Sequence, residues 1–174
     1  MSQPTLPMAR LVRTAYDENG KSVFASDSVL PSFSPIGPKG SSFTIFDSRT
    51  AVPVNNQEIP GSFAEAIPRC PPNGAIFCMT DFKPGGRAPM HRTVSLDYAV
   101  VVSGEIVIVL EGGEERTVKQ GEMIVQQGAN HAWINRTDEV CRMVFVTLSA
   151  DKVRLQDGTE LDETLIKAET KLGL

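Results

Sequence analysis

Short runs of apolar and β-branched residues recur along the chain, and turns that often contain glycine separate them. Residues 98–102 and 106–110 are two such runs, joined at Ser103-Gly104. The other runs lie at 43–46, 75–82, 115–118, 123–126, 131–136 and 141–149. Many short strands at this spacing are typical of an antiparallel sandwich or barrel, so the pattern predicts an all-β fold.

The two ends of the chain have different patterns. Residues 9–14 and 22–25 flank Asn19-Gly20, a pair that favours a tight turn, and they predict an N-terminal hairpin. Residues 162–171 have helical propensity with acidic residues early, which predicts a short C-terminal helix. We therefore divide one structural domain into an N-terminal hairpin with an irregular covering segment (1–73), a barrel (74–150) and a helical tail (151–174).

Composition narrows the function classes. The 174 residues carry a net charge of -4 without a basic stripe, which argues against a nucleic-acid partner. No apolar run is long enough to cross a bilayer, and the N-terminus lacks a secretory pattern, so we expect a cytoplasmic protein without a membrane partner. The three cysteines include no C-x-x-C, which argues against a zinc knuckle or a dithiol redox centre.

The chain has only two histidines, His91 and His131. Each opens a β-rich stretch after a glycine-containing turn, and Asp97 follows the first. Two imidazoles and one carboxylate that converged inside a small barrel would form a metal site or an acid–base site. Because side chains alternate along a strand, Trp133 and Asn135 should share a face with His131. By the same alternation we expect Arg92 to be a surface charge.

The spacing around the histidines is specific. Five, one, three and six residues separate Gly85, His91, Thr93, Asp97 and Gly104 in turn. Two and three residues separate Gly128, His131 and Asn135. These spacings resemble the two motifs of the cupin superfamily, G-x5-H-x-H-x3,4-E-x6-G and G-x5-P-x-G-x2-H-x3-N. Gln126 stands where the second motif has proline.

The resemblance implies a jelly-roll barrel and a divalent metal, which cupins usually hold through three His and one Glu. In this chain Thr93 replaces the second His and Asp97 replaces the Glu. The implied ligands are therefore His91, His131 and possibly Asp97, for iron, manganese, zinc or nickel, with no organic cofactor. The chain also looks like small single-domain cupins encoded in fungal and bacterial polyketide clusters, some of which are described as oxidoreductases.

Three functions follow as alternatives. The first is a metal-dependent oxidoreductase or oxygenase that acts on a small oxygenated metabolite, polyketide-like or phenolic. The second is a dehydratase, cyclase or isomerase that uses His91, His131 and Asp97 for acid–base catalysis, with or without a metal as Lewis acid. The third is a non-catalytic small-molecule-binding module. The candidate substrate-binding residues are Thr93, Gln126, Trp133 and Asn135. Because an exposed hairpin edge can pair with a second copy, we also expect a homodimer.

Overall fold

The computed structural model describes residues 6–164, which form an all-β fold without a helix. The strands are β1 (Ala9–Tyr16), β2 (Ser22–Leu30), β3 (Ser42–Arg49), β4 (Ala75–Phe82), β5 (Arg87–His91), β6 (Ser95–Ser103), β7 (Glu105–Leu110), β8 (Glu115–Lys119), β9 (Met123–Gln127), β10 (His131–Ile134) and β11 (Cys141–Ser149). All the named strand pairs are antiparallel. The predicted all-β antiparallel class is confirmed for this part of the chain.

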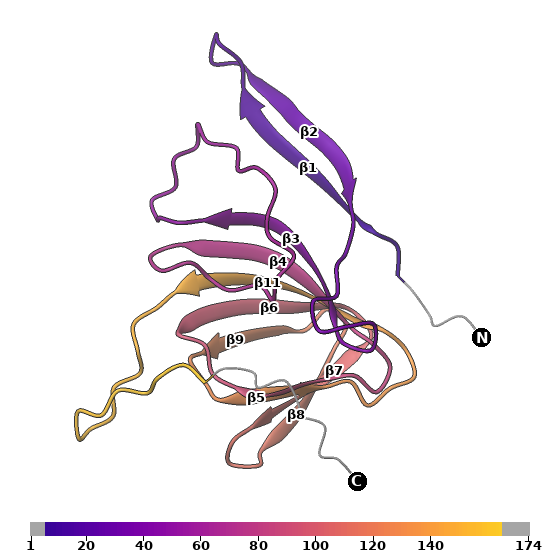
Figure 1. Ribbon diagram of the computed structural model, residues 1–174, viewed down its shortest axis with the longest axis vertical. Helices are drawn as coiled ribbons and strands as arrows, with labels where there is room; N and C mark the ends of the chain where they lie inside the picture. Colours follow the sequence, from indigo (N-terminus) through magenta and orange to yellow (C-terminus); the bar gives the residue numbers. More distant parts are fainter. Residues whose placement is uncertain (1–5, 165–174) are drawn as a thin grey trace.

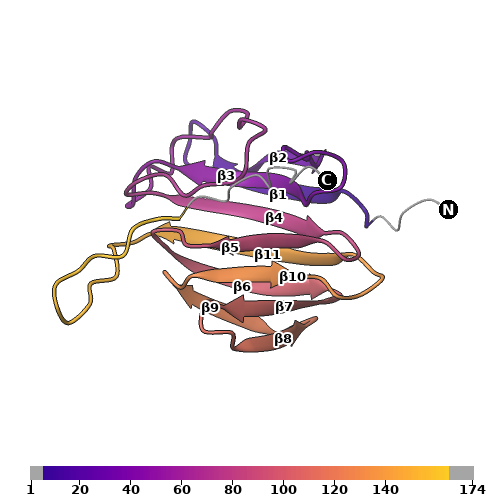
Figure 2. The same cartoon turned by 60° about the horizontal axis from the view of Figure 1, so that its bottom comes forward.

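Two sheets form the body of the protein. The five-stranded sheet has the order β3-β4-β11-β6-β9, and the four-stranded sheet has the order β5-β10-β7-β8. In Figure 1 the strands β5, β7 and β8 lie below the five-stranded sheet, and Figure 2 turns this side forward. The order mixes strands that are distant in the chain, which is the arrangement of a jelly roll.

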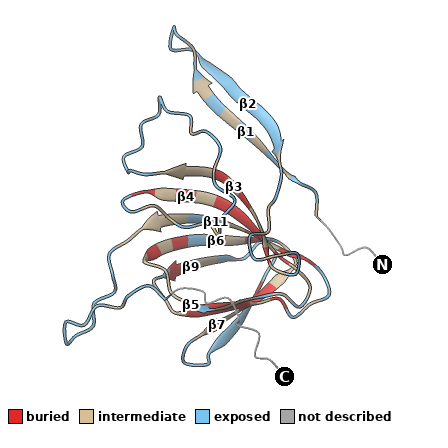
Figure 3. Ribbon diagram, viewed as in Figure 1, coloured by how far each residue is buried: buried red, intermediate tan, exposed pale blue. Residues whose placement is uncertain are grey.

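The core lies between the two sheets, because alternate side chains of each strand point inward. Val101 and Met143 from the five-stranded sheet are fully buried, and Ile106 from the four-stranded sheet is 1% exposed. These residues belong to one apolar cluster with Phe82, Ala99, Val118, Trp133 and Cys141. Figure 3 shows the buried residues concentrated in the body and the exposed ones along β2.

Gly104 makes the predicted turn between β6 and β7 possible. Its φ is +76°, in the left-handed region that favours glycine. A Cβ at this position would lie 2.9 Å from the carbonyl oxygen of Val140. The last glycine of the first motif is therefore explained by backbone geometry and close packing, not by chemistry at the site.

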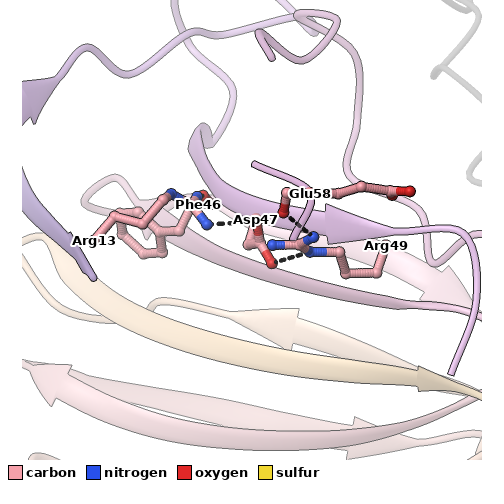
Figure 4. Close-up of polar contacts among 5 residues, drawn as sticks. All are labelled: Arg13, Phe46, Asp47, Arg49 and Glu58. Carbon is pink, nitrogen blue, oxygen red and sulfur yellow. Dashed lines mark hydrogen bonds and ion pairs between the residues drawn. The ribbon is translucent and has the colours of Figure 1, made fainter. Parts of the chain in front are cut away.

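The N-terminal hairpin extends away from the body (Figure 1). Its strands β1 and β2 are longer than predicted, and their register shifts between Arg13 and Thr14. Arg13 ties the hairpin to β3 by donating to Asp47 Oδ1 at 3.1 Å and to the Phe46 carbonyl at 2.9 Å. Arg49 holds the same Asp47 carboxylate from its other side, as Figure 4 shows.

The prediction of a C-terminal helix from residue 162 is wrong for the described residues 162–164, which are not helical. Thr164 instead pairs with Arg92 just after β5: its N–H donates to the Arg92 carbonyl at 3.0 Å, and the Arg92 N–H donates to Thr164 Oγ1 at 2.6 Å. Partners for these backbone groups outweigh the local helical propensity. The rest of the predicted helix lies outside the described residues.

Residues 6–164 contain no helix that could cross a lipid bilayer.

Candidate functional site

A cavity of about 440 Å³ contains the sequence-predicted centre. His91 from β5 and His131 from β10 line it on the four-stranded sheet, and Asp97 from β6 lines it on the five-stranded sheet. Phe82 and Phe145 contribute apolar walls. An apolar cavity with a few convergent polar groups is the usual form of a small-molecule site.

The two imidazoles lie side by side. His91 and His131 occupy directly opposite positions in the β5–β10 pair, and their ring centroids are 4.3 Å apart. His131 is only 2% exposed, whereas His91 is half-buried. Residues forty positions apart in the sequence therefore form one pair because a single strand register brings them together.

Backbone carbonyls fix the orientation of both rings. His91 Nδ1 lies 2.8 Å from the Pro89 carbonyl oxygen, and His131 Nδ1 lies 2.9 Å from that of Ala129. A carbonyl only accepts, so Nδ1 carries the proton in each neutral ring and Nε2 keeps its lone pair. Each ring can then accept a proton or bind a metal through Nε2.

Burial keeps His131 neutral. The pKa of His131 is lowered from 6.5 to about 4, first by loss of hydration and then by the neighbouring charge of His91, while the hydrogen bond to Ala129 opposes the shift. At neutral pH this imidazole is therefore uncharged, which is the form that can act as a ligand or as a proton acceptor.

Asp97 is buried on the opposite wall. Burial raises the pKa of its carboxyl, and the hydroxyls of Ser95 and Thr147 and the charge of His91 offset part of the increase. Gln126 Nε2 donates to Asp97 Oδ2 at 3.0 Å. Within residues 6–164 no three His, Cys, Asp or Glu side chains are placed to hold a metal together. Asp97 is thus not grouped with the two imidazoles, although the charge of His91 acts on it, and its part as a third ligand stays a prediction.

Two of the four candidate substrate-binding residues line the cavity. Thr93 lines it with its Oγ1 accepting from Ser95 Oγ at 2.9 Å. Trp133 lines it with its ring edge-on to His131, at a centroid distance of 5.4 Å. Gln126 does not line the cavity and reaches it only through Asp97.

Asn135 has a structural environment. It is fully buried, and its amide donates to the carbonyls of Phe82, Lys83 and Glu139 at 2.7–3.1 Å. Its Oδ1 accepts from the N–H and the hydroxyl of Thr137. It does not line the cavity, so we leave Asn135 out of the proposed site.

The expectation that Arg92 is a surface charge is wrong. Its side chain is 12% exposed and donates from Nε to the Gly128 carbonyl at 3.2 Å. Arg92 thereby connects the end of β5 to the loop before β10, and so joins the segments that carry the two histidines.

Sequence reasoning missed several cavity residues: Thr80, Ser95, Thr147 and Ser149 on the strands, and Cys70 on the covering loop. The alternation of polar residues in the sequence could have identified some of these residues. Thr93, Ser95 and Asp97 alternate, as do Thr147 and Ser149, so each set should face one side of its strand. Only the pairing of β6 with β11 shows that both sets face the same cavity.

Comparisons with known proteins identify the family of the chain. The family model described as the cupin domain matches residues 78–147. Phomopsin biosynthesis cluster protein C' of Diaporthe leptostromiformis is 36% identical over 92% of this chain and 86% of its own length. Cupin-domain-containing oxidoreductase fogC of Aspergillus ruber is 35% identical over 86% of this chain and 78% of its own length.

Among solved structures, the cupin domain of Schizosaccharomyces pombe Cnp3 superposes with a TM-score of 0.51 and 10% identity, covering 80% of this chain and 87% of that one. At this identity the likeness concerns the fold alone. Together with the two curated relatives and the matched motif region, it leaves one assignment: the chain belongs to the cupin family, and its relatives include proteins named for fungal biosynthesis clusters.

Proposed function

We propose that this protein is an enzyme that acts on a small, partly apolar, oxygenated metabolite, and that it is of the oxidoreductase type for which several relatives are named. The observation that carries the proposal is the pair of imidazoles, 4.3 Å apart, at the wall of a largely apolar cavity. A phenolic or polyketide-like molecule has the size and mixed polarity that such a cavity accepts.

The two histidines are the residues of this chain that can transfer a proton. With Nδ1 held by a carbonyl, Nε2 of each ring can take a proton from a substrate hydroxyl and return it. Trp133 provides a flat apolar surface beside His131, and Thr93 provides a hydroxyl nearby on the cavity wall. These side chains can position a substrate and move a proton, and a redox reaction additionally needs an electron acceptor.

The imidazole pair also fits a divalent metal held by His91 and His131 through Nε2. Hydrogen bonds from the other ring nitrogen to a carbonyl are the usual support of metal-binding histidines, and both rings have one. When bound, such a metal would supply Lewis acidity or the activation of oxygen. Asp97 is not grouped with the two rings, so water or substrate would complete the coordination.

Metal content is the test. We expect untagged protein to contain stoichiometric divalent metal by mass spectrometry, His91→Ala and His131→Ala to lose it, and Asp97→Asn to retain it, because the proposed ligands are the two imidazoles alone. A metal-free protein whose activity on aromatic aldehydes or ketones still needs both histidines would instead support acid–base catalysis. Binding of such compounds that survives His131→Ala, without turnover, would support a non-catalytic binding module and contradict the proposal.

A further inference from the structure

The inward face of the five-stranded sheet changes character along its length. Its middle is apolar, with Ala99 and Val101 on β6 and Met143 on β11 buried in the core. At the cavity end the inward positions are polar instead. They are Ser95 and Asp97 on β6, Thr147 and Ser149 on β11, and Gln126 on β9. We call these five residues the polar ladder.

Strand register assembles the polar ladder. Asp97 lies directly opposite Thr147 on one side and Gln126 on the other, and Ser95 lies directly opposite Ser149. Four of the five members line the cavity, and Gln126 supports Asp97 from outside it. The sheet therefore presents a continuous polar wall across three neighbouring strands, facing the sheet that carries the imidazoles.

Folding alone does not account for this wall. Polar side chains at inward positions of a sandwich destabilise the fold unless hydrogen bonds compensate them. Some are compensated, since Ser149 Oγ accepts from the Asn73 N–H at 3.0 Å. Within the described residues, the buried Asp97 Oδ1 has no hydrogen-bond partner of good geometry, although the nearby hydroxyls of Ser95 and Thr147 lower the pKa of this carboxyl. A wall that the protein satisfies only in part is suited to a polar ligand.

Aromatic side chains line the cavity beside and opposite the ladder. Trp133 on β10, in the opposite sheet, packs edge-on at a centroid distance of 6.1 Å against Phe145, which precedes the ladder position Thr147 on β11. We propose that the polar ladder is a subsite that binds the hydroxyl or carbonyl groups along one edge of the substrate, while its flat apolar body packs on Trp133. This inference rests on the proposed function and adds the distribution of polarity that the substrate must have.

Resorcinol and m-xylene test the subsite, because they share a shape and differ only by hydroxyl for methyl. Trp133 is the single tryptophan, so its indole N–H resonance in the full-length protein reports binding at the cavity wall. We expect Thr147→Val, which replaces a hydroxyl by a methyl, to weaken resorcinol binding about five- to tenfold and to leave m-xylene binding unchanged or tighter. Ser95→Ala should act in the same direction.

Thr117→Val is the matched control, since Thr117 is exposed on β8 and should change neither affinity. If both probes bind the wild-type protein and Thr147→Val and Ser95→Ala affect them equally, the ladder is not a subsite, while the proposed function stands. If neither probe shifts the Trp133 resonance, the cavity does not accept small oxygenated aromatic molecules, and both proposals are overturned.

Discussion

Protonation of His131 is coupled to the stability of the fold. Its pKa is lowered by burial to about 4, whereas the unfolded chain has an ordinary value near 6.5. Between these values the unfolded chain binds the additional proton, so acid favours unfolding. We expect the free energy of unfolding of metal-free protein to decrease by on the order of 3 kcal/mol as the pH falls from 6.5 to 4. Urea titrations at a series of pH values measure it.

His131→Gln is the control for this prediction, because glutamine keeps a polar side chain without a titratable group. Asp97 acts in the opposite direction, since its raised pKa makes protonation in acid favour the folded chain. Asp97 is present in both proteins, so a comparison with His131→Gln cancels its contribution. The free energy of unfolding of His131→Gln should therefore depend less steeply on pH than that of the wild-type protein. Parallel curves for the two proteins would show that His131 is not the group responsible.

Strands were predictable from the sequence where one face is buried. The apolar runs at 75–82 and 141–149 coincide with β4 and β11, which are central in their sheet. The strand β5 was not predicted, because Pro89 breaks the usual strand pattern; an edge strand tolerates it, and β5 is an edge. Motif spacing identified Asp97 but not its position: β6 lies in the sheet opposite β5 and β10, so this carboxylate faces the imidazoles across the cavity.

Asn135 fixes the connection between β10 and β11. Its side chain satisfies carbonyls at the end of β4 and in the following turn, as well as the N–H of Thr137. Asn135→Ala leaves several of these groups without partners, so we expect a loss of about 2–4 kcal/mol in the free energy of unfolding. Asn130→Ala is the matched control, because within residues 6–164 its side-chain amide donates only to the exposed Glu111, and the substitution should cost less than about 1 kcal/mol. Equal losses in urea unfolding would contradict this role.

At the scale of the whole molecule, the N-terminal hairpin is the element that is least supported by packing within one chain. A two-stranded ribbon is marginal in water on its own, and β2 is exposed along almost its whole length. Phe24 is 78% exposed, and Val29 is 53% exposed on the same strand. In Figure 3 the hairpin stands apart from the buried body. A second copy of the chain that covers this ribbon would bury these side chains and protect its strand edges.

We therefore expect a homodimer by light scattering at micromolar concentration, and we expect Phe24→Asp to shift the mass to that of a monomer by placing a charge in the covered surface. Met123→Asp is the matched control, because Met123 is 76% exposed on β9, at the other edge of the five-stranded sheet from the hairpin side. It should leave the mass unchanged. Circular dichroism should show the same strand content in all three proteins, since the hairpin contributes little to the core. A monomeric wild-type protein, or equal dissociation by both substitutions, would remove the hairpin as the dimer contact.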